Sequence, residues 1–406
     1  MKYILKFGNQ YIKLNIAVNA NVITVNSTPA AEPDKGSFTD NLSVLLPPEI
    51  RTAGIVVSDK TRLCGYNKYL SWVIDKLEKE GLDKNSIKIY IAYGTHPRQS
   101  EAESIRIYGS TYKKYDFIHH NCDDVENMVS LGFTSRGTEV KIRKDILDHD
   151  LLILFGVVSH HYFAGYGGGR KLIFPGLAER ESIYLNHKLF IDFDNMKLHD
   201  ECRSGNLSGN PVAEDLYEID RLMPDKIIIT GIPDSNGNIK RLITGKKYND
   251  FLKACSIYDD HYRNKDGIMY DNIIASAGGY PKDINFIQTH KSLHNAASFV
   301  RDGGNLFLLA ECTDGVGNDE FLNIFKGNSR KDIYNNLRHK YSGNGGTALS
   351  LLSKTERINV YMLTELDNNT CRTLGINKLE HEDMLSRTGK LEGSIAIIHN
   401  ASIVYR

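Results

Sequence analysis

The segment that most constrains the fold is residues 151–158, an apolar run without a charged side chain. Runs of this kind are typical of strands buried on both faces, as in parallel sheets. A glycine-rich segment and then a helical pattern follow it. Similar strand–helix pairs are predicted at residues 54–58 with 67–80, and at residues 87–93 with a helix from about residue 99. This alternation predicts α/β architecture with mainly parallel sheets flanked by helices.

The length of the chain predicts two domains, because 406 residues exceed what one ordinary hydrophobic core accommodates. A hairpin at residues 226–244 and a helix at 248–263 precede a second series of strands. That series is predicted at residues 272–276, 305–310 and 358–363. We therefore expect an N-terminal α/β domain over residues 1–264, opening with strands at 3–7, 11–18 and 22–25, and a C-terminal α/β domain over residues 265–390. The closing residues 391–406 complete either domain.

Composition narrows the class of protein. Fifty basic and fifty acidic residues cancel, which argues against a nucleic-acid or membrane-surface partner. No apolar run reaches the roughly 18 residues of a membrane helix. Six cysteines lie far apart in the sequence, which is typical of reduced thiols in the cytoplasm and not of a disulfide framework or a zinc ribbon.

Polar clusters follow four of the predicted strands. They contain Asp59, Thr61 and Arg62; His96; His160, His161, Arg170 and Lys171; and Tyr280, Gln288 and Lys291. Ligands of open α/β sheets bind beyond the carboxyl ends of the strands, so we expect a site at this edge. Arginine, lysine and histidine together suit a carboxylate or a phosphate. Two structural alternatives stay open: Asp59 and Thr61 as caps of the following helix, and residues 94–97 as a simple turn.

Four glycines, Gly165, Gly167, Gly168 and Gly169, precede Arg170 and Lys171. The segment is not a Walker A loop, because no hydroxyl follows the lysine, and Arg170 stands where the dinucleotide fingerprint needs its third glycine. Glycines before a helix still allow backbone N–H groups to approach a phosphate closely. A mononucleotide-like ligand is therefore the expectation.

Taken together, the motifs at residues 58–62, 94–96, 161–171, 186–187 and 278–291 resemble those of the nickel-pincer lactate racemases and their 2-hydroxyacid racemase and epimerase relatives. The resemblance spans almost the whole chain. It implies two α/β domains with the active site in the cleft between them. It also implies an isomerase that racemises or epimerises a small 2-hydroxyacid by proton-coupled hydride transfer.

The cofactor implied by the resemblance is the nickel-pincer nucleotide, a pyridinium mononucleotide with thioamide and thiocarboxylate arms that hold Ni(II). Lys171 would carry it covalently and His187 would be the nickel ligand of the protein. Enzymes that synthesise this cofactor are the implied protein partners. By the same resemblance, the residues that would surround or support the cofactor are Asp59, Thr61, Gly165, Gly167, Gly168, Gly169 and Arg170.

His96 and His161 would form the acid/base pair, and the residues that would face the substrate are Arg62, Tyr280, Gln288 and Lys291. This chain departs from the lactate racemase pattern at Lys60 and Leu63, which replace a histidine and a proline, and at His160, where a small polar residue is usual. A cation at position 60, facing the cleft, would favour a second carboxylate or a polyhydroxylated acid. A nucleotide- or metal-dependent oxidoreductase or hydrolase, and a non-catalytic organic-acid binding protein, remain the alternative functions.

Overall fold

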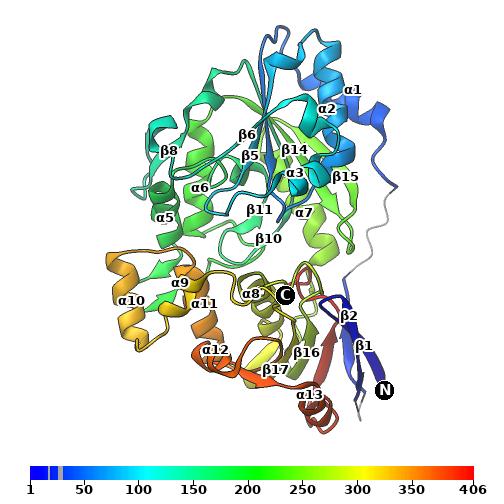
Figure 1. Cartoon of the computed structure of the whole chain (residues 1–406), viewed down its shortest axis with the longest axis vertical. Coiled ribbons are helices and arrows are strands. Elements are labelled where there is room, and N and C mark those ends of the chain that lie inside the picture. The colour runs from blue at the N-terminus through cyan, green and yellow to red at the C-terminus, as the bar shows by residue number, and fades with distance from the viewer. Residues whose placement is uncertain (17–18, 26–30) are drawn as a thin grey trace. The chain divides into compact units, whose positions relative to one another are not determined.

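The computed structural model describes residues 1–16, 19–25 and 31–406. The chain divides into two compact units. The N-terminal unit comprises residues 27–189 and 201–261, and the C-terminal unit comprises residues 1–26, 190–200 and 262–406. Figure 1 labels many of their helices and strands. Within the described residues, no helix has the length and apolar composition that a membrane crossing requires.

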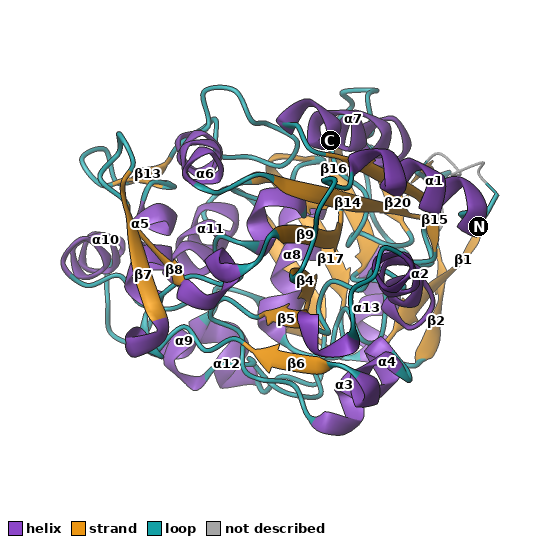
Figure 2. Cartoon of the chain, turned by 90° about the horizontal axis from the view of Figure 1, so that it is seen from above, coloured by secondary structure: helices purple, strands orange, loops and turns teal. Residues whose placement is uncertain are grey.

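The N-terminal unit is built on a six-stranded sheet in the order β15-β14-β9-β4-β5-β6, parallel except for β15. Its strands follow one another in this way in Figure 2. The sheet strands are β4 (Ala53–Ser58), β5 (Ile87–Ala92), β6 (Asp116–His119), β9 (Leu151–Val157), β14 (Lys226–Pro233) and β15 (Ile239–Gly245). Two ribbons lie outside it, β7 (Met128–Phe133) with β8 (Glu139–Arg143) and β10 (Ser159–His161) with β11 (Gly165–Gly167).

The helices of this unit are α1 (Lys35–Leu45), α2 (Tyr66–Lys79), α3 (Glu101–Tyr108), α4 (Thr111–Lys114), α5 (Arg180–Lys188), α6 (Pro211–Leu222) and α7 (Tyr248–Tyr262), with 3-10 turns η1 (Lys84–Ser86), η2 (Val125–Asn127), η3 (Lys144–Asp148) and η4 (Gly169–Leu172). Every residue of β9 is buried, as its apolar sequence predicts. Alternate residues of β9, such as Ile153 and Phe155, join one core with α1, α2 and α3. η4 packs against β4, β9 and β14.

The C-terminal unit is built on a second six-stranded sheet, entirely parallel, in the order β19-β18-β17-β16-β20-β3. Its strands are β3 (Asn21–Ile23), β16 (Tyr270–Ser276), β17 (Val300–Leu309), β18 (Asn359–Leu363), β19 (Asn377–Leu379) and β20 (Ile395–Ile398). Hairpins are formed by β1 (Lys2–Phe7) with β2 (Gln10–Asn15) and by β12 (Ile191–Asp192) with β13 (Lys197–Leu198). The helices are α8 (Phe286–Ala297), α9 (Asp319–Asn323), α10 (Arg330–His339), α11 (Gly345–Thr355), α12 (Asn368–Thr373) and α13 (His381–Thr388).

The two faces of this second sheet have separate cores, because successive side chains of a strand point to opposite faces. Ile273 packs in the core shared with α8, α11 and α12. Its neighbour Ile274 packs in the core shared with the β1–β2 hairpin and α13. The first residues of the chain therefore cover a sheet whose strands, apart from β3, lie more than 250 positions later in the sequence.

The strand–helix units were predicted correctly, but the predicted domain division differs from the two compact units. Residues 1–26 belong with the C-terminal unit, because β3 pairs with β20 and the β1–β2 hairpin packs on that sheet. Residues 190–200 belong there as well, and the closing residues 391–406 belong there because β20 pairs with β16. The predicted boundary at residue 264 lies close to residue 262, where the chain passes from the N-terminal unit into the C-terminal unit for the last time.

Two local predictions near the start of the chain need correction. The first part of the chain was predicted to be β-rich, and it also contains helix α1, which Asp34 caps by accepting from the Ser37 N–H. The predicted strand over residues 11–18 ends at Asn15, and its residues 17 and 18 lie outside the described residues.

Candidate active site

Three adjacent strands of the N-terminal sheet, β9, β4 and β5, end at the same edge. Their register pairs Ser58 with Ala92 and Val57 with Phe155. Asp59 and Arg62 follow β4, His96 follows β5, and the glycine-rich segment follows β9. The parallel arrangement thus gathers these predicted site residues at the position where ligands of α/β sheets bind.

Asp59 and His96 form a hydrogen-bonded pair, with 2.7 Å between Asp59 Oδ2 and His96 Nδ1. Asp59 Oδ1 accepts from the backbone N–H and the hydroxyl of Thr61, and the carboxylate is 3% exposed. Burial alone would raise the pKa of Asp59, but His96, Thr61 and the charge of Arg62 lower it to about 2. Asp59 is therefore an ionised acceptor, so the Nδ1 of His96 carries the proton and its Nε2 is free to act as a base.

This arrangement excludes the helix-capping alternative for Asp59. Helix α2 begins at Tyr66 behind Gly65 and has no side-chain cap. Residues 94–97 do form a turn, closed by the His96 N–H bond to the Tyr93 carbonyl, and that turn presents His96 to Asp59.

Lys60 pairs with a carboxylate of the neighbouring helix. Its Nζ lies 2.7 Å from Glu103 Oε1 on α3, and both side chains are partly exposed. The positive charge that distinguishes this motif is therefore already balanced by Glu103. The structure gives no support for an additional free cation at position 60.

The β10–β11 ribbon carries the tandem histidines. His160 pairs with Tyr166 and His161 with Gly165, and successive residues of a strand face opposite sides. The His161 ring accordingly contacts Phe163, with 4.5 Å between ring centroids, whereas His160 bonds to Asp259 of α7.

The glycine segment packs closely on its neighbours. Gly168 has φ +83°, and a Cβ there would lie 2.5 Å from the carbonyl oxygen of Val157. Gly169 has φ +53°, and its Cβ would lie 2.7 Å from the Phe251 ring. A Cβ at Gly167 would lie 3.8 Å from Nε of Arg62, so Arg62 extends over this segment. Tight packing therefore explains Gly168 and Gly169, while contact of the four glycines with a phosphate stays a prediction.

Phe163 brings three of the predicted residues together. The Nζ of Lys171 lies 5.5 Å from the centroid of the Phe163 ring. The rings of His187 and His161 meet it edge-on, at 4.9 and 4.5 Å between centroids. Phe163 was not among the residues predicted for the site. The only sequence signal for it is an aromatic residue between a histidine and a glycine-rich loop, and such a residue is more often part of a core.

Lys171 and His187 are both held toward their uncharged forms. Burial lowers the pKa of Lys171 well below its usual value, and the charges of Arg62 and Arg170 lower it further. Burial lowers the pKa of His187 to about 3, with a further contribution from Lys171. The Nδ1 of His187 is buried without a hydrogen-bond partner among the described residues. A nucleophilic amine and a metal-binding imidazole need these uncharged forms.

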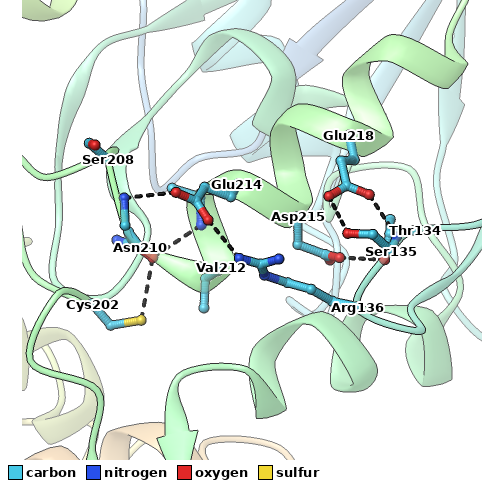
Figure 3. Close-up of polar contacts among 12 residues, drawn as sticks. Thr134, Ser135, Arg136, Cys202, Ser208, Asn210, Val212, Glu214, Asp215 and Glu218 are labelled. Atoms are coloured by element: carbon cyan, nitrogen blue, oxygen red, sulfur yellow. Dashed lines mark hydrogen bonds and ion pairs between the residues drawn. The ribbon is translucent and has the colours of Figure 1, made fainter.

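Helix α6 is hydrogen-bonded to the segments that carry Phe163 and His187, and Figure 3 shows polar contacts of this helix. Asp215, fully buried, accepts hydrogen bonds from Thr134, Thr138 and Asn186. Asn186 immediately precedes His187 on α5, so Asp215 fixes the helix turn that carries the imidazole. Asn210, the N-cap of α6, donates from Nδ2 to the carbonyl of Phe163.

Arg170 is a buried cation without a hydrogen-bond partner. It is 3% exposed, and its guanidinium lies 5.5 Å from the ring centroid of Tyr248 and 5.1 Å from that of Phe251. None of its three guanidinium nitrogens has a partner among the described residues. Because unpaired buried charge is costly, this geometry suits an anion such as a phosphate.

The remaining predicted residues belong to the C-terminal unit. Gln288 and Lys291 lie in the first two turns of α8, and Lys291 Nζ donates to Gln288 Oε1 over 2.6 Å. Tyr280 is 52% exposed. Lys291 therefore follows a strand of the second sheet, and our expectation that it shares one sheet edge with Arg62 and Lys171 was wrong.

The described residues contain no group of three or more histidine, cysteine, aspartate or glutamate side chains able to hold a metal ion. A metal bound to His187 would therefore need its other donor atoms from a source other than such a cluster. The sulfur arms of the expected cofactor are donors of this kind.

Two family comparisons cover most of the chain. Residues 37–198 match the lactate racemase N-terminal domain, and residues 265–344 match the lactate racemase C-terminal domain. The lactate racemase of Thermoanaerobacterium thermosaccharolyticum is 30% identical over 286 residues, which are 70% of this chain and 65% of that protein. The lactate racemase of Lactiplantibacillus plantarum is 29% identical over 274 residues, 66% of this chain and 62% of that protein. Each alignment spans just under two thirds of the relative.

Solved structures share the fold over a larger part of the chain. The lactate racemase apoprotein of Thermoanaerobacterium thermosaccharolyticum has a TM-score of 0.86 and 23% identity, and the alignment covers 100% of this chain and 99% of that one. A protein from Thermotoga maritima has a TM-score of 0.71 and 14% identity, covering 93% and 100%. With both domain families matched in order, the chain belongs to the lactate racemase family.

Proposed function

We propose that this protein is an isomerase that racemises or epimerises a small 2-hydroxyacid with a nickel-pincer nucleotide attached to Lys171. One observation carries the proposal. An amine with a lowered pKa, a neutral buried imidazole and a second histidine all contact the ring of Phe163. A covalently attached metal cofactor next to a proton carrier requires this set of groups.

The residues fit such a cofactor. Lys171 has the uncharged character that covalent attachment requires, and His187 offers a neutral ring to nickel, for which imidazole is a suitable ligand. Arg170 is adjacent to Lys171 in the sequence, and its guanidinium has no hydrogen-bond partner among the described residues. We therefore assign Arg170 to the phosphate of the nucleotide. When bound, the cofactor supplies an electrophilic pyridinium carbon that accepts a hydride from C2 of the substrate and returns it.

The chain itself moves the protons. In the neutral form of His96, Asp59 accepts a hydrogen bond from Nδ1–H, so Nε2 is the nitrogen that removes the hydroxyl proton of one enantiomer as hydride leaves C2. C2 then carries a neutral ketone group, so no second negative charge develops beside the carboxylate. His161 acts in the same way on the other enantiomer. General acid–base assistance of this kind contributes roughly 10²–10⁴-fold to the rate.

Arg62 anchors the substrate carboxylate while the ketone end turns over. A unit charge pair at about 4 Å with an effective dielectric near 20 is worth roughly 4 kcal/mol before desolvation. Contact of Tyr280, Gln288 and Lys291 with the substrate stays a prediction that rests on the family resemblance alone. Asp59 bonds to Thr61 and to His96, so both residues support His96, and their contact with the cofactor stays a prediction.

The substrate proposed is a small monocarboxylic 2-hydroxyacid such as lactate. Both curated relatives are named lactate racemase, and the Lys60 charge that would have favoured a second carboxylate is paired with Glu103. We place the protein in the cytoplasm with the enzymes that synthesise its cofactor, since all six of its cysteines are free thiols.

The test is a racemisation assay on protein co-produced with the cofactor-synthesising enzymes and loaded with nickel. Single enantiomers of lactate, malate, aryl and sugar acids are incubated, and the products are separated on a chiral column. We expect racemisation of lactate, with His96→Ala and His161→Ala each losing at least about 100-fold in kcat. His381→Ala, which changes an exposed histidine of α13, serves as the control.

Two results would overturn the proposal. Turnover of NAD(P) by nickel-free protein would indicate an oxidoreductase. Binding of 2-hydroxyacids without isomerisation, in protein whose cofactor and nickel content are complete, would indicate a binding protein.

A further inference from the structure

The β10–β11 ribbon needs an anchor outside its own hydrogen bonds. It consists of three residue pairs, and two of its six residues are glycines. It lies outside the six-stranded sheet. An isolated two-stranded ribbon is only marginally stable in water. Because His161 stands on this ribbon, the ribbon must be fixed if a proton is to be transferred at a defined position.

One face of helix α7 supplies such an anchor. His160 Nε2 lies 2.7 Å from Asp259 Oδ1, and the two side chains are 6% and 16% exposed. The ring of Tyr258 meets the His160 ring edge-on at 4.9 Å between centroids, and Tyr166, the cross-strand neighbour of His160, lies at 5.5 Å. The ribbon is thus both bonded and packed through His160.

The same helix also holds the other end of the glycine segment. Tyr248 and Phe251 enclose the guanidinium of Arg170. Positions 248, 251, 258 and 259 follow the spacing that places residues on one side of a helix. This face of α7 therefore contacts the segment at residue 160, before the glycines, and at residue 170, after them.

We propose that His160 and Asp259 are a positioning pair for His161. Their hydrogen bond fixes the face of the ribbon turned toward α7, and the adjacent His161 is thereby fixed on the opposite face, where it contacts Phe163. In this proposal the pair acts through His161 and not on the reacting atoms. The inference rests on the proposed function for the role of His161, but the anchoring itself is a property of the chain alone.

The test compares variants that break or keep the bond. His160→Phe retains an aromatic ring against Tyr258 but cannot bond to Asp259, whereas His160→Gln places an amide nitrogen near the position of Nε2. Asp259→Leu breaks the same bond by changing the helix residue. It is the bond-breaking variant to use if His160→Phe does not fold. His149→Phe is the matched control, since His149 bonds to the Tyr90 hydroxyl just before β9, at the opposite end of that strand.

The first measurement is amide hydrogen exchange of the cofactor-free protein over residues 159–167. We expect exchange there to quicken at least about 10-fold in His160→Phe and Asp259→Leu, and to stay within about threefold of wild type in His160→Gln. The imidazole signals of His161, assigned by their loss in His161→Gln, should shift in the first two variants. His149→Phe should leave both the exchange and the His161 signals unchanged.

The second measurement is the steady-state kinetics of the loaded enzyme. The bond-breaking variants should lose about 10-fold or more in kcat with KM nearly constant, and His160→Gln should recover most of the loss. Unchanged exchange and kcat in His160→Phe and Asp259→Leu would overturn the inference, as would equal effects in His149→Phe. If wild type racemises no 2-hydroxyacid, the proposed function fails, while the exchange data still decide whether the pair anchors the ribbon.

Discussion

Replacing Asp59 with asparagine should reverse the tautomer of His96. Oδ1 of Asp59 accepts two hydrogen bonds from Thr61, and Oδ2 accepts one from Nδ1 of His96. In Asp59→Asn the side-chain oxygen must stay with the Thr61 N–H, so the amide NH₂ faces His96. Nδ1 then becomes an acceptor, and the imidazole proton moves to Nε2, where a base is needed.

The size of the effect follows from the bond that must be broken. To act as a base, His96 in the variant has to give up its new hydrogen bond and leave a buried amide unpaired, which costs roughly 1.5–3 kcal/mol. Because about 1.4 kcal/mol corresponds to a factor of ten in rate, kcat should fall about 10- to 150-fold. KM for the 2-hydroxyacid should change little, since Arg62 is untouched.

Two assays check this expectation. Chiral analysis of lactate gives kcat, and long-range ¹H–¹⁵N spectra of the cofactor-free protein identify the nitrogen of His96 that carries the proton. Lys60→Met is the control, because the neighbouring Lys60–Glu103 pair is partly exposed and contributes little, so its kcat should stay within about twofold of wild type. An Asp59→Asn protein that keeps its Nδ1 proton, or keeps full kcat, would refute the reasoning.

Three further outcomes are expected. Phe163→Ala removes a buried ring on which His161 and His187 pack, so the free energy of unfolding in urea should fall by about 3–5 kcal/mol; a fall below about 1 kcal/mol contradicts this packing. Lys171 should be methylated by formaldehyde and borane at pH 7 faster than exposed lysines, because its lowered pKa leaves more neutral amine; peptide mass spectrometry checks it, and preferential labelling of the exposed lysines refutes it. The pKa of Asp59 falls from 3.8 to about 2 on folding, so the stability it provides is complete above about pH 4 and is lost as the pH falls toward 2. The difference in unfolding free energy between wild type and Asp59→Asn should therefore shrink over that range, and a constant difference would contradict the assignment.

The strand–helix order was predictable because each element has a strong local signal. The apolar run that became β9 is buried along its whole length, and the strand ends carry the expected polar residues. The local sequence of a strand does not indicate which sheet the strand joins. Nothing in residues 1–26 indicates that β3 pairs with β20 or that Ile274 packs against the first hairpin. The domain boundaries were therefore predicted less well than the elements.

In the site, the types of residue were predictable and their contacts were not. His96 and Asp59 follow different strands, and only the parallel register brings them within 2.7 Å. Similarly, an aromatic residue such as Phe163 has the same sequence signature in a core and in a site. The face of α7 that encloses Arg170 has regular helical spacing, but the spacing alone does not indicate what it contacts.

The most direct test of the account is the mass of Lys171 in protein co-produced with the cofactor-synthesising enzymes. Intact and peptide mass spectrometry should find an adduct on Lys171, with the mass of the pyridinium mononucleotide and its two sulfur arms less the small molecule that is released when one arm condenses with the amine. The adduct should be absent from Lys171→Ala, and bound nickel should be lost in His187→Ala. An unmodified Lys171 in protein that racemises lactate would contradict the account.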